Sequence, residues 1–253
     1  MNTNSNTYTV IYSAILVIVV AAVLAFVAMF LKPSQEKNVK EETISQILNA
    51  ASIEIENNNV LGTYSAQIAS AILVNGNGEK VGELATDLKN IKVYTTSELK
   101  RQTKIAEAGE MKLPVYIFNN GITVVPCYGA GLWGPIWGYI GFNSDLKTIS
   151  KAVFDHKSET PGLGAKITEE PFRSQFAGKQ VGAGETAFAV VKAGTPVDNN
   201  SVNAISGATI TSQSMGRTLD QWFTYYKPYF SANAAVEAPV EATSEETVNN
   251  VEE

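Results

Sequence analysis

The chain of 253 residues is long enough for one sizeable domain or two small ones, and its hydrophobic content of 45% is ordinary for a globular protein. Its formal charge of −6 comes from residues 231–253, which hold six glutamates and no Lys or Arg, so the rest of the chain is neutral. A neutral body without a basic patch argues against nucleic-acid binding. With one cysteine, Cys127, and one histidine, His156, the chain alone cannot form a disulfide, an iron–sulfur cluster or a metal site of several such ligands.

An uncharged apolar run of 22 residues, 10–31, follows the N-terminal segment 1–9. As an α-helix it would be about 33 Å long, close to the thickness of a bilayer core. A cleaved signal peptide would have a basic start and a small-x-small exit, and the sequence has neither. A buried core helix is the alternative, but such helices rarely stay apolar on every face. We therefore predict an uncleaved transmembrane helix over residues 10–31.

The remaining chain mixes hairpin signals with helical periodicity and shows no βαβ units. In chain order, we predict a polar linker (32–40), a juxtamembrane helix (41–55), a hairpin with an Asn-Gly turn (70–84), a second hairpin (113–127), a strand (135–142), a short helix closed by Gly178 (168–178), a buried strand (186–194) and a C-terminal helix ending near Pro228. This pattern predicts an α+β fold, in which helices flank a mostly antiparallel sheet, as one domain over residues 32–230. The tail, 231–253, is predicted to be disordered.

The stretch GAGLWG, Gly129 to Gly134, matches the dinucleotide-binding pattern G-x-G-x-x-G. A Rossmann site also needs a helix to begin there, whereas Pro135 and a strand-like run follow. We therefore predict a glycine-rich loop between strands. It is either a plain connection or a loop where glycines such as Gly131 let a flat ring approach the backbone beside Trp133.

The stretch HKSETPGLGA, residues 156–165, contains the turn pair Pro161-Gly162 and a further glycine. Taken alone it reads as a surface turn. The alternative is a loop that lines a ligand site, with its backbone N–H groups pointing inward and Leu163 offering an apolar face. His156 and Glu159 would then either contact the ligand or shape the loop. No nucleophile-elbow pattern accompanies His156, and we predict no catalytic residue.

The stretch SGATITS, residues 206–212, stands at the start of the last predicted helix. Thr209, Thr211 or Ser212 could simply cap that helix. The N-terminus of a helix also stabilises a phosphate, by roughly 0.3–1 kcal/mol if exposed, through its unpaired N–H groups and partial positive charge. The small residues Gly207 and Ala208 leave room beside the Thr209 hydroxyl. A phosphodiester could therefore be attached there.

Together, behind one N-terminal anchor, these three stretches resemble the C subunit of the bacterial Na+-translocating NADH:quinone oxidoreductase. The chain is also similar, more distantly, to the G subunit of the Rnf electron-transport complex. The resemblance covers most of the chain from the anchor to about residue 230 and leaves out the acidic tail. The tryptophan of the glycine-rich stretch, Trp133, favours the first of these two relatives over the Rnf relative.

In that family the motif S/T-G-A-T carries FMN through a phosphoester bond to its last threonine, which implies Thr209 here. The TPGLG loop of the family borders the flavin ring, and its G-x-G-L-W-G tryptophan is expected near the flavin. The cofactor-binding residues so implied are Thr209, Ser206, Gly207, Ala208, Thr211, Thr160, Gly162, Leu163, Gly164, Glu159, Gly131 and Trp133. The resemblance implies no metal site.

The function that the resemblance implies is a subunit that relays single electrons through covalent FMN and neither oxidises NADH nor translocates Na+ alone. Its expected partners are the other subunits of a membrane respiratory complex, a flavin transferase and membrane lipid. The family's soluble domain faces the periplasm from the inner membrane. Lys32, Lys37 and Lys40 favour the opposite side, but acidic residues stand among them and we follow the resemblance.

One position departs from the family pattern. Asn203 stands three residues before Ser206, where the family often has an acidic residue. If that acid helps to bind Mg2+ or the flavin transferase, attachment of the flavin is expected to be slower here or to depend on other contacts. Two alternatives stay open: a G subunit of the Rnf type with the same flavin chemistry, and a membrane-anchored scaffold without cofactor, in which Thr209 is only a cap.

Overall fold

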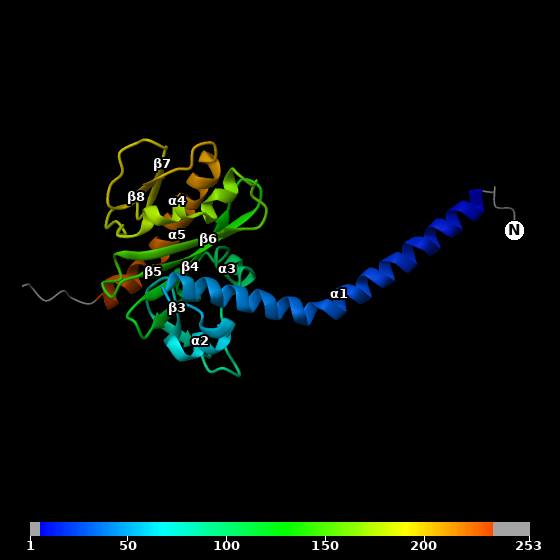
Figure 1. Cartoon of the computed structure of the whole chain (residues 1–253), viewed down its shortest axis with the longest axis horizontal. Coiled ribbons are helices and arrows are strands. Elements are labelled where there is room, and N and C mark those ends of the chain that lie inside the picture. The colour runs from blue at the N-terminus through cyan, green and yellow to red at the C-terminus, as the bar shows by residue number, and fades with distance from the viewer. Residues whose placement is uncertain (1–5, 235–253) are drawn as a thin grey trace, which may run out of the picture.

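The computed structural model describes residues 6–234, so most of the tail predicted to be disordered lies outside the described residues. The first described element is one long helix, α1 (Asn6–Ala50), which reaches far out of the folded body (Figure 1). Residues 10–31 of α1 are exposed on every side, and the most apolar part of the helix has a mean hydropathy of 3.2. A helix with this length and composition can cross a bilayer, as predicted for 10–31.

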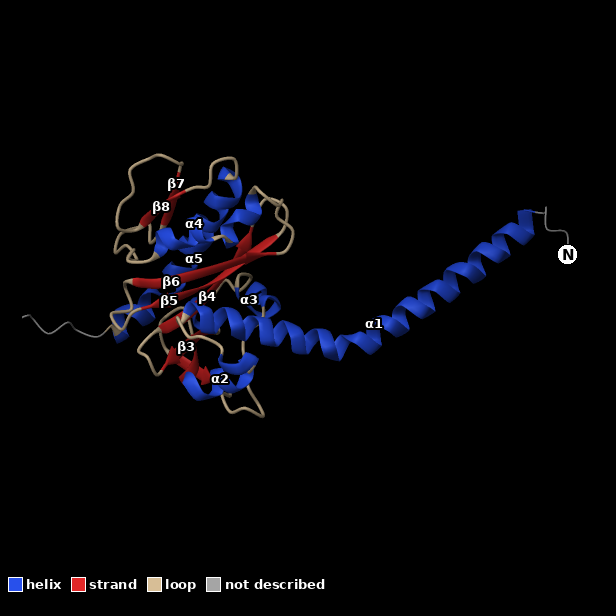
Figure 2. Ribbon diagram, viewed as in Figure 1, coloured by secondary structure: helices blue, strands red, loops and turns tan. Residues whose placement is uncertain are grey.

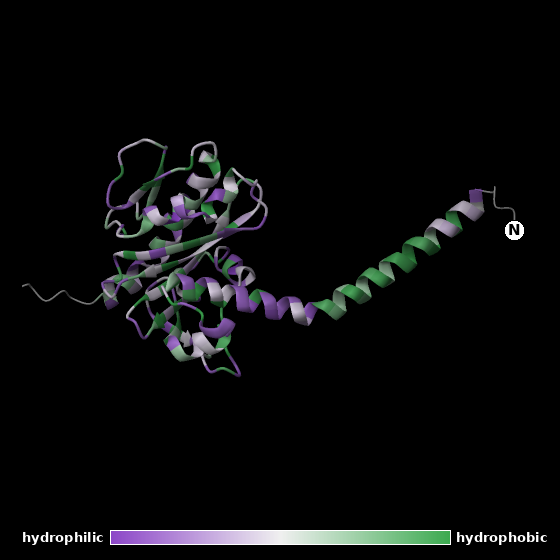
Figure 3. Cartoon of the chain, viewed as in Figure 1, coloured by the Kyte–Doolittle hydropathy of each residue, from purple (hydrophilic) through white to green (hydrophobic). Residues whose placement is uncertain are grey.

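The predicted linker at 32–40 is wrong, because α1 continues through it. Pro33 removes one backbone hydrogen bond, which bends a helix without necessarily ending it. Figure 1 shows a bend partway along α1, and Figure 3 shows that the apolar segment gives way to a polar one there. Ion pairs between residues one turn apart support the helix here: Lys32–Glu36 at 3.9 Å spans Pro33, and Lys37–Glu41 at 3.8 Å follows it. The helix ends at Ala50 and not at Ile55 as predicted.

A six-stranded antiparallel sheet forms the centre of the folded body. Its order is β2 (Lys80–Glu83), β1 (Ile68–Val74), β3 (Leu113–Phe118), β4 (Thr123–Ala130), β5 (Pro135–Phe142) and β6 (Ile149–His156). The predicted α+β fold with a mostly antiparallel sheet is confirmed, as are both hairpins and the strand 135–142. The first hairpin turns through five residues, 75–79, where the Asn75 carboxamide accepts from the N–H groups of Asn77 and Glu79. The strand β6 was not predicted.

Helices pack on both faces of the sheet (Figure 2). On one face, the buried Ile44, Ile47 and Leu48 of α1 form a core with side chains of the sheet. On the other face lies α5 (Thr209–Asn233), whose buried side chains recur at helical intervals as predicted: Met215, Leu219, Trp222 and Tyr226. Two polar groups of α5 are satisfied by the strands, since the Trp222 indole donates to the Tyr128 carbonyl at 2.8 Å and the Tyr226 hydroxyl to the Pro114 carbonyl at 2.9 Å.

The C-terminal helix does not end near Pro228 as predicted. It continues to Asn233, because Tyr229 and Phe230 are still buried against the core and their packing outweighs the one hydrogen bond that Pro228 removes. The predicted strand 186–194 is correct only for its centre, β7 (Ala189–Val191), which pairs parallel with β8 (Ser201–Asn203).

The smaller helices connect these elements. They are η1 (Glu56–Asn58), α2 (Val60–Gln67), α3 (Thr96–Gln102), η2 (Ala108–Glu110), η3 (Gly164–Thr168), α4 (Glu170–Arg173) and η4 (Ser174–Phe176). The predicted short helix 168–178 therefore consists of α4 and η4, and Gly178 follows it with a φ of 78°.

The direction of α1 decides which end of the sheet faces the anchor. Gln46 of α1 bonds to Trp137 and Asp155 near one end of β5 and β6, and the Ala50 carbonyl lies against Gly141 farther along β5. Going back along α1 toward the apolar segment therefore leads toward the start of β5. The loop between β4 and β5 and the loop after β6 lie at that end, on the side from which α1 leaves the body (Figure 1).

Candidate functional site

The three stretches singled out in the sequence meet at the anchor side of the sheet. They are the loop between β4 and β5, the loop after β6 and the start of α5, and they enclose an open cavity of about 280 Å³. The cavity is lined by Leu132, Trp133, Glu159, Thr160, Leu163, Gly164, Gly207, Ala208, Thr209, Ile210 and Thr211. Of the predicted site residues, Ser206, Gly162 and Gly131 do not line it but lie beside residues that do. The volume is near the lower end of the range for small-molecule sites.

The start of α5 presents the Thr209 side chain to the cavity. Thr209 is exposed and is the first residue of the helix, after Ala208 in the N-cap position. The alternative that Thr209, Thr211 or Ser212 caps the helix is wrong, because no side chain caps α5. The Ser212 hydroxyl instead donates back to the Ala208 carbonyl at 2.9 Å and accepts from the Ile205 N–H at 3.0 Å.

The first backbone N–H groups of α5 are available as donors. Within residues 6–234, no acceptor is found for the N–H groups of Thr209, Ile210 and Thr211. Unpaired N–H groups at the start of a helix of 25 residues attract an anion through their direct hydrogen bonds and through the helix dipole. This end of α5 can therefore hold a phosphate next to the Thr209 hydroxyl.

A left-handed glycine shapes the approach to the helix. Gly207 has a φ of 81°, a conformation that is unfavourable for a residue with a side chain. A Cβ atom at Gly207 would lie 3.6 Å from the Leu163 side chain, which is ordinary van der Waals contact. Gly207 is thus required by the turn into α5 and brings Leu163 of the second loop close to the first turn of the helix.

Glu159 joins all three segments although it is a charged residue with only 3% of its surface exposed. One carboxylate oxygen accepts from the Trp133 N–H at 2.8 Å, and the other accepts from the Thr211 hydroxyl at 2.7 Å. A Cβ atom at Gly131 or Gly164 would lie 2.5 or 2.3 Å from these oxygens. Gly131 and Gly164 therefore make room for the Glu159 carboxylate. This explains why both positions are glycine without the close approach of a ring.

Four large apolar side chains surround the cavity and face solvent. The exposed fractions are 47% for Leu132, 66% for Trp133, 46% for Leu163 and 56% for Ile210. Exposed apolar side chains grouped around a cavity are typical of a binding site for a flat apolar ring. Leu132 and Ile210 were missed in the sequence, although each adjoins a predicted residue, Trp133 or Thr209.

The loop after β6 is held by its own polar groups. The ring nitrogen Nδ1 of His156 accepts from the Glu159 N–H at 3.2 Å, so His156 shapes this loop from outside the cavity lining. The Thr160 carbonyl accepts from the N–H groups of Leu163 and Ala165, and Gly162 supplies a φ of 77°. The Ser158 hydroxyl donates to the Trp133 carbonyl at 2.8 Å, which fixes the neighbouring loop.

The structure offers no evident metal centre near the cavity. Among residues 6–234, no three His, Cys, Asp or Glu side chains come together as a metal ion would require. Cys127 lies in the core of the sheet, where burial raises the pKa of its thiol.

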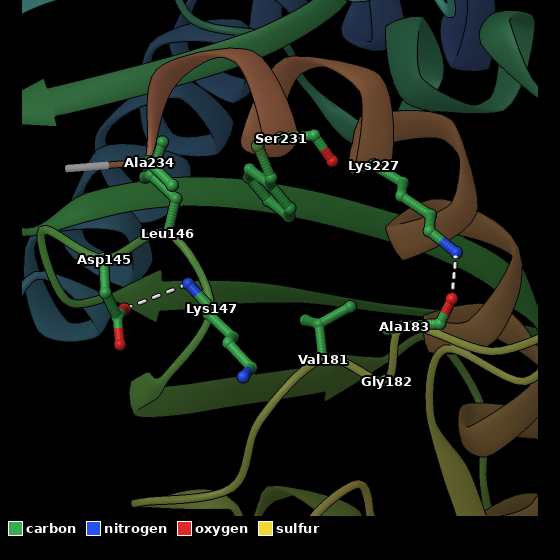
Figure 4. Close-up of a pocket in the computed structure, with 10 residues that line it drawn as sticks. Asp145, Leu146, Lys147, Val181, Gly182, Ala183, Lys227, Ser231 and Ala234 are labelled. Carbon is green, nitrogen blue, oxygen red and sulfur yellow. Dashed lines mark hydrogen bonds between the residues drawn. The ribbon is translucent and has the colours of Figure 1, made fainter. Parts of the chain in front are cut away.

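A second cavity, of about 310 Å³, lies toward the other end of α5 (Figure 4). Lys227, Ser231 and Ala234 of α5 and its C-terminal end line it together with residues 145–147 and 181–183. The Lys227 ammonium is already bound to the Ala183 carbonyl at 2.7 Å. About 20 residues of helix, or roughly 30 Å, separate this cavity from Thr209. None of the three stretches reaches it, so we do not assign it to the candidate site.

The part of the chain that contains the first cavity matches a known protein family. Residues 131–224, which include the lining of the first cavity, match the family model described as FMN-binding domain. The chain is 28% identical over 238 residues to the C subunit of the Na(+)-translocating NADH-quinone reductase of Haemophilus ducreyi, covering 87% of this chain and 89% of that protein. It is 26% identical over 248 residues to the protein of the same name from Neisseria meningitidis, covering 87% and 93%.

Solved structures give the same result. The crystal structure of the C subunit of the Na(+)-translocating NADH-quinone reductase from Parabacteroides distasonis is 34% identical and has a TM-score of 0.66, covering 79% of this chain and 97% of that one. The crystal structure of Shewanella oneidensis NqrC is 26% identical and has a TM-score of 0.63, covering 78% and 98%. The similarity thus extends over nearly the whole of each of these solved chains.

Proposed function

The chain belongs to the family of FMN-carrying C subunits of Na+-translocating NADH-quinone reductases, and from this premise we propose that FMN is bound covalently to its Thr209. The bond would be a phosphoester to the threonine hydroxyl, and the flavin would relay single electrons within the membrane complex. The observation that carries this proposal is the exposed Thr209 at the first position of α5, beside unpaired N–H groups and an apolar rim.

The residues around the cavity fit FMN. The N–H groups of Thr209, Ile210 and Thr211 would hold and orient the phosphate, which keeps a negative charge as a diester. Leu163, Trp133 and their neighbours on the rim would cover part of the ring and exclude water from it. The remaining predicted residues, Ser206, Gly207, Ala208, Thr160 and Gly162, would shape the backbone around the tether. When bound, the flavin supplies one-electron redox chemistry, while the protein sets its position and surroundings.

The chain would not be catalytically competent alone. The stretch 129–134 that matches a dinucleotide pattern is followed by β5, not by a helix, so it lacks the helix N-terminus that a Rossmann site needs. Within residues 6–234, α1 is the one helix long and apolar enough to span a bilayer. Oxidation of NADH and translocation of Na+ would therefore depend on other subunits.

The direction of α1 supports an electron-transfer partner in the membrane. The cavity lies at the end of the sheet from which the anchor leaves, so the ring would face the bilayer side of the domain. We propose that the anchor lies in the bacterial inner membrane with the domain in the periplasm. A flavin transferase could reach the exposed Thr209 there, and membrane lipid would surround residues 10–31.

The departure at position 203 bears on the rate of modification. Asn203 ends β8, its N–H donates to the Gln175 carboxamide at 3.0 Å, and its own side-chain oxygen is buried without a partner among the described residues. An amide here cannot supply the negative charge of the family's acid. We propose that the flavin is still attached, but more slowly than in an Asn203→Asp variant.

In-gel fluorescence after denaturing electrophoresis tests the tether. The full chain is co-expressed with a flavin transferase that is shown to modify a control protein. We expect a fluorescent wild-type band, a dark Thr209→Ala band and a fluorescent Thr211→Ser band. A dark wild-type band would instead favour a scaffold without cofactor. Co-purified subunits distinguish this reductase from an Rnf-type complex.

A further inference from the structure

Glu159 is an unusual residue to find buried beside a phosphate-binding helix end. Isolated buried carboxylates are costly, and they persist where hydrogen bonds to charged oxygens compensate. Among residues 6–234, Glu159 has no ion pair, yet both of its oxygens accept a hydrogen bond from a different segment. Because those segments are loop 131–134 and the first turn of α5, one side chain links parts of the chain that are distant in sequence.

We infer that Glu159 is a positioning residue: its carboxylate fastens the Trp133 loop and the first turn of α5 to the loop after β6, and so sets the Thr209 hydroxyl for attachment of the flavin. This inference rests on the proposed function for its last step only. The link between the segments is independent of any cofactor.

The geometry explains why an acceptor is needed there. The Trp133 N–H can only donate, and the carboxylate accepts from it with one oxygen and from the Thr211 hydroxyl with the other. Thr211 is two residues from Thr209 on the same first turn, so holding the Thr211 hydroxyl restricts how that turn can move. The negative charge also lies close to the start of α5, where the helix dipole favours it.

The glycines on either side of the Glu159 carboxylate support its role as a link between the segments. A Cβ atom at Gly131 would lie 2.5 Å from one oxygen of Glu159, and one at Gly164 would lie 2.3 Å from the other and 2.7 Å from the Thr211 hydroxyl. Both loops thus lack side chains where the carboxylate enters between them. A carboxylate closely enclosed on both sides, with two donors in hydrogen-bond range, has little freedom to leave.

The hydrogen-bond partners of the Glu159 carboxylate lie within the protein itself. Each of its oxygens already accepts one hydrogen bond, from the Trp133 N–H or the Thr211 hydroxyl, so a role for the carboxylate follows from the protein's own contacts without a ring. The sequence left two roles open for Glu159, contact with the ligand or shaping of the loop, and these contacts favour the second. The two roles predict different behaviour in a chain that cannot carry flavin.

Hydrogen exchange in such a chain tests the link directly. The full chain with Thr209→Ala, in lipid nanodiscs, is compared with and without Glu159→Ala and Glu159→Gln. Losing the acceptor should speed exchange of the Trp133 amide by about 10- to 100-fold, since hydrogen bonds to charged groups are worth about 1.5–3 kcal/mol. Gln can still accept from Trp133, so Glu159→Gln should stay within a few-fold of the parent. Glu170→Gln, an exposed carboxylate on α4, is the matched control and should change nothing.

Flavin attachment tests the positioning step. With Thr209 intact and the transferase present, the initial rate of modification should fall in Glu159→Ala and in Thr211→Val, and recover in Thr211→Ser. The double variant Glu159→Ala/Thr211→Val should be no slower than the slower single variant, because both remove the same contact. Circular dichroism confirms that each variant is folded, and Thr211→Val, which removes the same contact from its other end, keeps the comparison possible if Glu159→Ala is not folded.

The outcomes separate the two claims. Unchanged exchange at Trp133 in folded Glu159→Ala protein would overturn the link. Faster exchange with a wild-type rate of flavin attachment would overturn the positioning role. If the wild-type chain takes no flavin from an active transferase, the proposed function and the positioning step both fall, and the exchange data still decide the link.

Discussion

Replacing Gly207 by alanine tests whether this glycine of the SGAT stretch is required by the backbone or by the cofactor. Gly207 has a φ of 81°, and no atom lies closer than 3.6 Å to a Cβ atom built there. The substitution therefore creates no clash and isolates the left-handed conformation. That conformation costs an L-residue about 1–2 kcal/mol. Alanine also restricts the unfolded chain, which returns about 0.4–1 kcal/mol.

The two effects leave a net loss of about 1 kcal/mol in the free energy of unfolding. For a domain of this size, that corresponds to a fall of about 2–4 °C in Tm. Thermal unfolding of the Thr209→Ala chain in detergent, followed by near-ultraviolet circular dichroism, measures the fall without flavin. Gly207→Asn should lose less than Gly207→Ala, because Asn tolerates the left-handed region better.

Two glycines serve as matched controls. Gly121 has a φ of 83° with nothing within 4 Å, so Gly121→Ala should lose as much as Gly207→Ala. Gly184 has open space and no positive φ, so Gly184→Ala should not lower Tm. The reasoning would be refuted if Gly121→Ala lowered Tm and Gly207→Ala did not, because Gly207 would then have no structural need in the unmodified chain.

Two further predictions concern parts of the fold away from the site. Burial alone would raise the pKa of Asp145, but hydrogen bonds from Thr148 and Lys147 outweigh it and hold that pKa below its ordinary value. Because the folded-state pKa is the lower one, the stabilisation is present above the unfolded pKa of about 3.9 and is lost as the pH falls through the folded pKa. Asp145→Asn should therefore lower Tm at neutral pH and match the wild type in strong acid, and an equal deficit at both pH values would contradict this. Cys127, buried with a raised thiol pKa, should react with a maleimide at neutral pH only after denaturant is added, and rapid labelling of the folded chain would argue against its place in the core.

The sequence predicted best those elements whose local pattern and tertiary environment agree. The strand 135–142 begins and ends where predicted, since apolar residues alternate with glycines between turn signals. The strand β6 was missed because Lys151 and Asp155 interrupt its apolar character. Asp155 is used by Gln46 from α1, more than a hundred residues earlier, and a local pattern does not carry such a contact.

In the candidate site, too, local motifs could be predicted from the sequence and contacts between distant segments could not. Its three stretches could be found by their motifs, and the structure brings them together around one cavity. The contact between Glu159 and Thr211 spans 52 residues of sequence and has no local signature. The glycines were recognisable, but their purpose was not, because Gly131 and Gly164 are explained by a carboxylate that arrives from another segment. Propensity and motif spacing give no information on such packing.

The helices near both ends of the chain are longer than the sequence predicted, and this was the largest error in the predicted elements. The polar residues 32–40 suggested a linker and Pro228 suggested a helix end, yet both Pro33 and Pro228 lie inside a helix. Proline costs one hydrogen bond and bends the helix, but α5 still packs beyond Pro228, and α1 carries one ion pair across Pro33 and a second after it. On the proposed function, the continuation of α1 beyond Pro33 would set which side of the domain faces the membrane.

Mass spectrometry of the protein taken from its native membrane tests the central claim most directly. The intact mass is expected to exceed that of the polypeptide by one FMN less one water, and fragmentation of the peptide spanning residues 206–217 is expected to place that mass on Thr209. The same peptide from the Thr209→Ala chain should carry no addition. An unmodified polypeptide, or FMN attached at Thr211 or elsewhere, would contradict the account.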